Sequence, residues 1–136
     1  MVTFVAGSEA LAAVDGFVSS WIAKGIRRKA SFLTEDFTLW NNRYKVTLSK
    51  PVAVKYFDWL KTVMGDNRYY DIRRYLSPTG AVQQHLTSYE TAQGKFRDIP
   101  MLLIFTTRGS KVARCEEYVD STGLPSLEWP EGTEFF

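Results

Sequence analysis

Apolar residues near the start of the chain recur every three or four positions, which is the spacing of one buried helix face. These residues are Leu11, Val14, Val18, Trp21 and Ile22. Ser8 precedes them as a favourable N-cap, and Gly25 follows them as a favourable C′ residue. The pattern predicts a first helix between Ser8 and Gly25, and a second short helix from Ile26 to Leu33.

A further helix is predicted after Ser49, which can cap it, with Pro51 in its first turn. Gly65 is expected to end this helix. Its apolar face comprises Val52, Tyr56, Trp59, Leu60 and Val63. Between the helical regions, the segment from Phe37 to Asn42 has the pattern of a strand.

The second half of the chain alternates between strand patterns and short turns such as Ser77-Pro78-Thr79-Gly80. The predicted strands are Arg68–Leu76, Val82–Glu90, Lys95–Thr107 and Lys111–Asp120. Short turns join antiparallel neighbours, and helices that precede such a meander cover one of its faces. The predicted fold class is α+β in the order α-α-β-α-β-β-β-β. It is a cone-shaped curved antiparallel sheet wrapped over the N-terminal helices, closing over a mostly apolar pocket.

Composition and charge narrow the class of protein. The 136 residues are 45% hydrophobic, which predicts one domain over residues 1–136. The 17 Lys and Arg residues nearly balance 15 Asp and Glu residues, so nucleic acid is not an expected partner. The longest apolar run, from Met101 to Phe105, is too short to cross a membrane, and the first residues lack the basic region of a signal peptide. With a single cysteine, Cys115, no intrachain disulfide is possible, and a cytoplasmic location is expected.

The last predicted strand carries a carboxylate among apolar groups. Alternation puts Ala113, Cys115, Glu117 and Val119 on one face, and its small and apolar residues mark that face as the inner one. A carboxylate placed there is suited to general acid or base work, which makes Glu117 a candidate catalytic residue. The alternative is that Glu117 is solvated or pairs with a structural arginine.

The chain has one histidine, His85, which shares a strand face with Gln83 and Thr87. Alternation does not decide whether this face is inner or outer. On the inner face, His85 would lie across the sheet from Glu117, and a carboxylate beside an imidazole fixes its tautomer and raises its basicity. The two are then the candidate acid and base. The alternative is a surface histidine or one satisfied in the core.

Further candidate residues would bind a substrate. Trp40 and Asn42 share a face of the first strand, so Trp40 is expected to wall the pocket and Asn42 to orient a substrate oxygen or water. The alternative is a core tryptophan beside a turn asparagine. The full set of candidate substrate-binding residues is Trp40, Asn42, Gln83, Thr87 and Cys115.

Several chemistries lack their sequence motifs. One histidine and one cysteine cannot supply a usual zinc site. The chain also has no Gly-rich phosphate loop and no G-x-S-x-G motif. Neither a metal nor a cofactor is therefore expected. Cys115 lies in mid-strand, away from any helix N-terminus, and is expected to be inert as a nucleophile.

The element order, and the segment from Gly109 to Asp120, resemble the nuclear transport factor 2-like superfamily. That segment has a turn glycine, an apolar strand start, an acidic residue, an aromatic residue and an aspartate. The segment from Glu35 to Asn41 is similar to the first strand of the family. The resemblance implies a cone-like fold that hosts many chemistries.

Within that superfamily the chain resembles SnoaL-like polyketide cyclases and limonene epoxide hydrolases. By this resemblance Glu117 takes the place of the last-strand aspartate, and Gln83 and His85 match the Gln-x-His pair of the cyclases. The hydrolases have Arg-x-Asp there, and a Tyr-x-Asn where this chain has Trp40-Asn41-Asn42. These two departures count against epoxide opening by the known triad.

The sequence therefore predicts a cofactor-free enzyme that isomerises, cyclises or dehydrates an apolar polyketide-, terpenoid- or steroid-like molecule. One alternative is an epoxide or ester hydrolase that uses an activated water. Another is a ligand-binding or assembly domain without catalysis. A homodimer is expected through the outer sheet face that carries Arg114, Glu116 and Tyr118, as family members commonly pair there. The tail, residues 121–136, is expected to pack across the domain, over the pocket mouth or onto a partner subunit.

Overall fold

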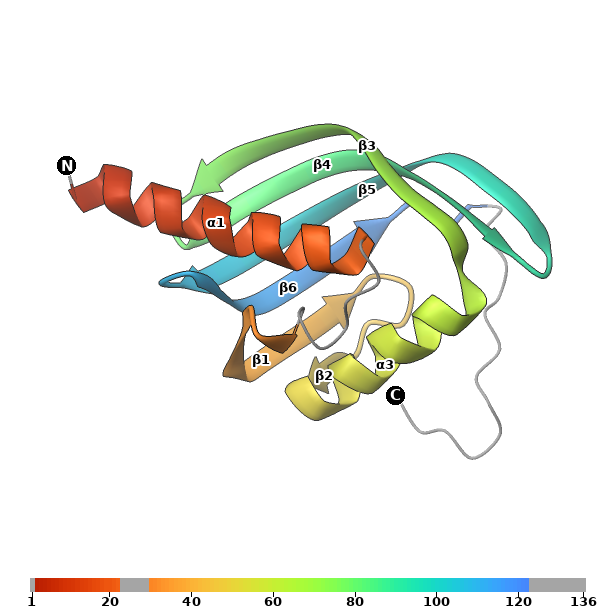
Figure 1. The fold of residues 1–136 in the computed structure, drawn as a ribbon, viewed down its shortest axis with the longest axis horizontal. Coiled ribbons are helices and arrows are strands. Elements are labelled where there is room, and N and C mark those ends of the chain that lie inside the picture. The colour runs from red at the N-terminus through yellow and green to blue at the C-terminus, as the bar shows by residue number, and fades with distance from the viewer. Residues whose placement is uncertain (1, 23–29, 123–136) are drawn as a thin grey trace.

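The computed structural model describes residues 2–22 and 30–122, and side chains from residue 7 onward within these ranges. The helices are α1 (Val2–Ile22) and α3 (Lys50–Val63). The strands are β1 (Leu33–Asn41), β2 (Thr47–Ser49), β3 (Gly65–Ser77), β4 (Gly80–Thr91), β5 (Gly94–Arg108) and β6 (Lys111–Val119). Figure 1 shows a curved sheet with α1 running across its concave side and α3 beside β1 and β2. The predicted α+β cone is confirmed.

Within the described residues, the sheet has six strands in the order β2-β1-β6-β5-β4-β3. The hairpins of the predicted meander are present, because β3–β4, β4–β5 and β5–β6 are all antiparallel pairs. The first strand, however, pairs with the last one in parallel, so the sheet is mixed rather than wholly antiparallel. The two strands are distant in sequence and are not joined by a hairpin turn, which would force them to be antiparallel.

Helix boundaries agree with the sequence pattern in part. Ser49 is the N-cap residue of α3 with Pro51 in its first turn, as predicted, although its side chain makes no capping hydrogen bond. The prediction of a start at Ser8 is wrong, because α1 already begins at Val2. Leu33, the expected last residue of a second helix, instead begins β1, and residues 26–29 of that helix lie outside the described residues, as do residues 123–136 of the tail. No helix in the described ranges is both long and apolar enough to span a bilayer.

Three of the β-bulges in the described strands each have an aspartate in the left-handed backbone region. Asp66 and Asp71 lie in bulges of β3 with φ of 44° and 53°, and Asp98 lies in a bulge of β5 with φ of 57°. Aspartate tolerates this conformation better than most residues because its short side chain can bond locally. Each extra residue bends its strand and increases the local twist. The bulges thus curve β3 to β5.

The bulge at Asp71 also exchanges the two faces of β3. Before it, Tyr69 pairs with the buried Thr87, and after it Arg74 pairs with the buried Gln83. Regular alternation would put Tyr69 and Tyr75 on one face, yet Tyr75 is 52% exposed. Because of the extra residue, Arg74 lies on the same helix-facing side of β3 as Tyr69, although regular alternation would put the two on opposite faces.

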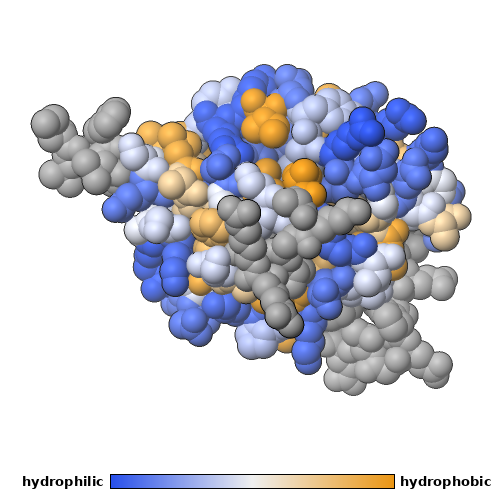
Figure 2. All heavy atoms as spheres, viewed as in Figure 1, coloured by the Kyte–Doolittle hydropathy of each residue, from blue (hydrophilic) through white to orange (hydrophobic). Residues whose placement is uncertain are grey.

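The core lies between the concave sheet face and the two helices. Phe17 of α1 is at its centre, and its ring packs against Phe37, Phe57 and Phe105 with centroid distances of 6.3, 6.0 and 5.3 Å. Trp21 adds a further ring contact with Phe57 at 5.9 Å. In the view of Figure 2, hydrophilic residues cover most of the described surface, and hydrophobic ones show only in small separate patches.

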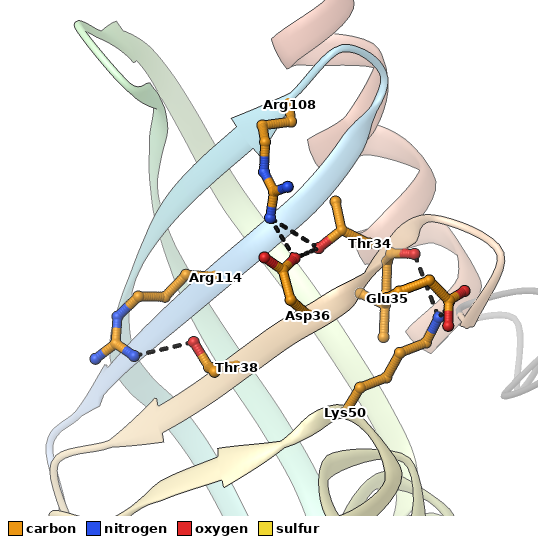
Figure 3. A network of polar contacts seen from close by, with 8 residues as sticks. Thr34, Glu35, Asp36, Thr38, Lys50, Arg108 and Arg114 are labelled. Carbon is orange, nitrogen blue, oxygen red and sulfur yellow. Dashed lines mark hydrogen bonds and ion pairs between the residues drawn. The ribbon is translucent and has the colours of Figure 1, made fainter.

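A polar network ties β1 to its neighbours on the outer side of the sheet (Figure 3). Arg108 contacts Asp36, and Arg114 donates to the Thr38 hydroxyl at 3.1 Å. Hydrogen bonds from Thr34 and Arg108 lower the pKa of Asp36 below its usual value. Lys50, the first residue of α3, lies 3.4 Å from Glu35. These exposed and half-buried groups link β1 to β5, β6 and the start of α3 on the outer side, away from the concave face.

Candidate functional site

A cavity of about 80 Å³ lies between the concave sheet face and the helices. Its apolar wall comprises Phe17, Trp21, Phe57, Leu60, Met64, Met101 and Val119. Its polar wall comprises Asn41, Arg43, Asn67, Thr87, Glu117 and the phenols Tyr56, Tyr69 and Tyr89. This volume is well below the roughly 300–1,000 Å³ of pockets for drug-sized ligands. In this conformation the cavity therefore suits a molecule of few non-hydrogen atoms.

A larger groove, of about 640 Å³, adjoins this cavity at the bent ends of β3, β4 and β5. Asn67, Tyr69 and Tyr89 line both spaces, so they form the partition between them. Charged pairs occupy the groove, with Arg68 at 3.2 Å from Asp66 and Lys95 at 3.5 Å from Glu90. These pairs are largely exposed, so the groove does not suit an apolar ligand and fits better as the approach to the inner cavity.

Glu117 lies in the wall of the inner cavity, on the concave face of β6. Its strand neighbours on that face are the buried Ala113 and Cys115, as alternation predicted. The parallel pairing aligns Glu117 with Asn41 of β1, and the Asn42 N–H donates to the Glu117 carbonyl oxygen at 3.0 Å. The backbone of the carboxylate residue is thereby held from the neighbouring strand.

Two tyrosines share the cavity with this carboxylate. Burial raises the pKa of Tyr56 well above its usual value, and the charge of Glu117 raises it further. The same two causes, in the same order, raise the pKa of Tyr69. Both phenols therefore keep their protons at neutral pH, and they can donate hydrogen bonds in a site that also contains a carboxylate.

Asn67 and Thr87 contribute further polar atoms on the β3 and β4 side of the cavity. Trp21 Nε1 donates to Asn67 Oδ1 at 2.8 Å, which orients the amide. The Nδ2 atom of Asn67 and the Oγ1 atom of Thr87 are buried without a hydrogen-bond partner in the described part of the chain. Buried polar groups without partners are uncommon, and they mark places where a ligand or water can bond.

His85 lies on the inner face of β4 and is 4% exposed. Its Nδ1 atom lies 3.0 Å from Gln83 Nε2, and the oxygen of the same amide accepts from Arg74 Nε at 2.7 Å. Arg74 in turn contacts Asp15 of α1 at 3.2 Å. Burial, and secondly the charge of Arg74, lower the pKa of His85 to about 4. The ring is therefore neutral at pH 7.

The predicted acid and base are on the same concave face, but β5 runs between their strands. Glu117 is aligned with Leu103 of β5, and His85 is aligned with Met101. Glu117 lines the cavity, whereas His85 lies just outside it, beside the lining residue Tyr69. The structure thus brings Glu117 to the two tyrosines and His85 to Gln83, with Tyr69 as the neighbour of both.

Two expectations on the first strand are wrong. The buried positions of β1 are Leu33, Phe37, Leu39 and Asn41, so Trp40 faces outward, where its ring packs on Tyr118 at 5.2 Å. The Asn42 side chain does not line the cavity, because it bonds the Val119 backbone in both directions at 3.0 Å.

The residue that does reach the cavity from this segment is Asn41. Its Oδ1 accepts from the Arg43 N–H at 2.7 Å, which fixes the amide. The sequence contained the signal, because alternation counted from Phe37 and Leu39 places Asn41 on the inner face.

The remaining candidates differ in their positions. Thr87 lines the cavity, and Gln83 lies behind the wall as the partner of His85. Cys115 is fully buried in the core cluster and does not line the cavity, which corrects its assignment as a substrate-binding residue. Cys115 is aligned with Leu39 of β1 and Phe105 of β5, so its thiol packs among core residues.

Tyr69 and Asn67 were missed by the sequence reasoning, because the bulges of β3 break the alternation that would have placed them. Tyr56 was predicted only as part of an apolar helix face. Together these residues add donors to a site with one carboxylate, an arrangement that can move a proton and stabilise the charge that develops on a substrate oxygen. Among residues 7–22 and 30–122, no three His, Cys, Asp or Glu side chains are grouped to hold a metal ion.

Comparisons with known proteins agree on the fold. No family model matches the sequence, and no curated protein matches it. A candidate polyketide cyclase from Xanthomonas campestris has a similar structure, with a TM-score of 0.74 at 14% identity over 85% of this chain and 93% of that one. An LEH-like epoxide hydrolase from M. tuberculosis has a TM-score of 0.72 at 11% identity, with 85% and 86% covered.

A nuclear transport factor 2-like protein from Burkholderia xenovorans has a TM-score of 0.72 at 15% identity, over 87% of this chain and 94% of that one. At sequence identities this low, a similar structure indicates a shared fold but does not indicate a shared reaction. With its open six-stranded sheet around α1 and α3, the chain has the nuclear transport factor 2-like fold.

Proposed function

We propose that this chain is a cofactor-free enzyme that transfers a proton within a small apolar molecule, leading to isomerisation, cyclisation or dehydration. One observation carries the proposal: Glu117 lines the inner cavity together with Tyr56 and Tyr69, two phenols that keep their protons. A base and hydrogen-bond donors in one low-dielectric space are what proton abstraction beside a carbonyl requires.

The Glu117 carboxylate removes a proton from the carbon next to a carbonyl, and the electron pair moves onto the carbonyl oxygen. Tyr56 or Tyr69 donates a hydrogen bond to that oxygen and stabilises the enolate. In a β,γ-unsaturated ketone, Glu117 returns the proton to the γ carbon, which moves the double bond into conjugation with the carbonyl and isomerises the molecule. In a β-hydroxy ketone, the enolate instead re-forms the carbonyl and expels the β-hydroxyl group, which takes the proton from Glu117 and leaves as water.

The cavity volume limits the substrate. At about 80 Å³ it accepts a small cyclic or short-chain carbonyl compound. A larger polyketide, terpenoid or steroid-like substrate requires the partition formed by Asn67, Tyr69 and Tyr89 to move toward the adjoining groove. Asn41 and Thr87 are assigned to positioning the substrate, and Gln83 to holding His85.

Hydrolysis with an activated water is the second candidate. Asn41 is aligned with Glu117 and lines the same cavity, so an amide and a carboxylate face one space in which a water could be held. The similarity in fold to an LEH-like epoxide hydrolase is in keeping with this reading. The departures from the hydrolase motifs at Gln83, His85 and Trp40 make proton transfer the preferred proposal.

The outer sheet face is proposed to pair two copies of the chain. It carries Tyr118, 38% exposed, beside the Arg114–Glu116 pair at 3.1 Å. Tyr75 is also exposed on this convex side. Tyrosine and arginine are among the residues enriched in protein interfaces. The concave cavity would then remain accessible in the dimer.

The test is exchange of the α-protons of small cyclic ketones in D₂O, followed by proton NMR with the purified protein. Glu117→Gln keeps the size of the side chain and removes the base, so it should lose on the order of 10²–10⁴ in rate. Glu116→Gln is the matched control, because it changes the adjacent carboxylate on the outer face. Exchange that Glu117→Gln leaves unchanged would refute the assignment of the base. Binding of the ketones without exchange would favour a binding domain.

A further inference from the structure

The arginine behind the cavity wall, Arg74, decides how the single histidine can act. It is half-buried on the inner face of β3, where the bulge at Asp71 directs it toward the helices. Its Nε atom donates to Gln83 Oε1 at 2.7 Å, and its Nη1 atom contacts Asp15 of α1 at 3.2 Å. Arg74 is thus held from two elements and faces a fully buried amide.

Arginine has hydrogen-bond donors only, so the oxygen of the Gln83 amide must face Arg74. The amide nitrogen then faces His85 Nδ1 at 3.0 Å, and it too can only donate. Nδ1 must therefore be the acceptor and carry no proton. In a neutral imidazole the proton then lies on Nε2.

The Nε2 atom of His85 is buried and has no hydrogen-bond partner among the described residues. The ring itself is 4% exposed and stacks on Tyr69 with a centroid distance of 3.9 Å. Three residues that line the cavity lie beside the histidine: Tyr69 stacks on its ring, Thr87 is two positions further along β4, and Met101 is its aligned neighbour on β5. The histidine thus lies behind the cavity wall, and the wall residues Asn67 and Thr87 carry two further buried atoms without partners, Nδ2 and Oγ1.

We propose that Arg74 is a positioning residue that, through Gln83, fixes His85 as a neutral Nε2–H donor for an acceptor oxygen of the bound molecule. This rests on the proposed function for the identity of the cavity as a substrate site. It changes the part assigned to His85: the ring donates a hydrogen bond and does not remove a proton. It also defines the ligand class further, because the ligand needs a carbonyl or similar oxygen at this end.

A protonated ring would carry a hydrogen on Nδ1, which would then face the N–H of Gln83 Nε2, so that two donors would meet. The arrangement therefore disfavours the imidazolium form of His85. The low pKa of His85, caused by burial and then by Arg74, agrees with this geometry. Among the neighbouring charged groups, Arg74 of β3 acts on the ring and is itself paired with Asp15 of α1. Asp71 and Arg73 of β3, and Asp120 after β6, line a surface groove together with His85.

The tautomer can be measured directly, because the chain contains one histidine. Long-range ¹H–¹⁵N spectra of protein labelled with ¹⁵N-histidine distinguish a protonated from an unprotonated ring nitrogen. At pH 7 the wild-type protein is expected to show a protonated Nε2 and an unprotonated Nδ1. A proton on Nδ1, or an imidazolium ion, would overturn the proposal.

Two variants test the role of Arg74. Arg74→Met removes the donors and keeps the stem, so the Gln83 amide can turn and the spectrum should become a mixture of tautomers. Arg73→Met is the matched control on the outer face of the same strand, aligned with the exposed Gln84, and should leave the spectrum unchanged. If Arg74→Met does not fold, Gln83→Glu decides, because its carboxylate accepts from Nδ1 and should put a proton there. A wild-type spectrum in either variant would refute the positioning role.

The ligand oxygen is tested with two molecules of similar shape, cyclohexanone and methylenecyclohexane. The ketone should shift the Nε2 resonance of the wild-type protein, and the hydrocarbon should not. Equal shifts, or no shift with the ketone at its highest soluble concentration, would refute the ligand contact. Because the tautomer is read without turnover, this result is separate from the Glu117→Gln test: unchanged turnover in that variant refutes the reaction and leaves the positioning role intact.

Discussion

Tyr69 stacks on His85 with ring centroids 3.9 Å apart, and its hydroxyl also responds to the charge of Glu117. One side chain therefore stacks on the histidine and shares the inner cavity with the carboxylate, although β5 separates the strands of His85 and Glu117. Its ring covers the histidine, and its phenol group belongs to the cavity that contains the carboxylate. The two parts of Tyr69 can be tested separately.

Tyr69→Phe removes the hydroxyl and keeps the ring. We expect a loss of about 10²–10³ in turnover, the usual effect of removing one donor to a developing oxyanion. The His85 resonances should stay near their wild-type positions, because the stacked ring remains. Ketone exchange assays and NMR of His85 give the two readouts. The control is Tyr70→Phe, whose hydroxyl bonds Ser88 at 2.8 Å on the outer side and should not affect turnover. Equal effects in the two variants would contradict the assignment.

The buried histidine should make stability depend on pH. Its pKa is lowered from 6.5 to about 4 in the folded state, so between these values the unfolded chain binds more protons than the folded one. The contribution of neutral His85 is fully present above pH 6.5 and is lost as the pH falls toward 4. The loss is at most about 3 kcal/mol in free energy of unfolding.

Urea unfolding at pH 7 and at pH 4.5 measures this loss. Carboxylates titrate in the same range, so the comparison must be with a variant that lacks the ring. His85→Gln should reduce the difference in unfolding free energy between the two pH values. A variant with the full wild-type pH dependence would show that other groups are responsible.

The two adjacent asparagines at the end of β1, Asn41 and Asn42, should have separate effects. Asn42→Ala removes both side-chain bonds to the Val119 backbone and should cost about 1–3 kcal/mol in unfolding free energy. Its turnover should be preserved wherever the protein remains folded. Asn41→Ala removes a cavity amide and should lower turnover more than stability. Thermal unfolding and ketone exchange on both variants check this, and a reversed order of effects would count against the assigned facing of the strand.

The proposed dimer predicts the mass of two chains in light scattering at micromolar concentration. Tyr118→Asp introduces a charge on the outer face, next to Glu116, and should favour the monomer because like charges would meet across the interface. If the wild-type protein is monomeric under these conditions, the proposed dimer is refuted. A variant that stays dimeric would place the interface elsewhere.

Local patterns were sufficient for much of this protein. Periodicity and turn residues, which act over a few neighbouring positions, were sufficient for the helix after Ser49, the three hairpins and the inward direction of Glu117. His85 could not be placed by alternation, because its strand has polar residues on both faces. Packing decided it, since α1 covers the face that carries Gln83, His85 and Thr87.

The composition of the site was decided by contacts between segments that are distant in sequence. The parallel pairing of β1 with β6 places Asn41 beside Glu117, and no local signal predicts which strand a first strand will join. The bulge at Asp71 puts Arg74 on the same inner face as Tyr69, because one inserted residue reverses every later side chain on the strand. The carboxylate could therefore be read from the sequence, whereas the phenol beside it and the arginine that orients the histidine could be found only in the folded sheet.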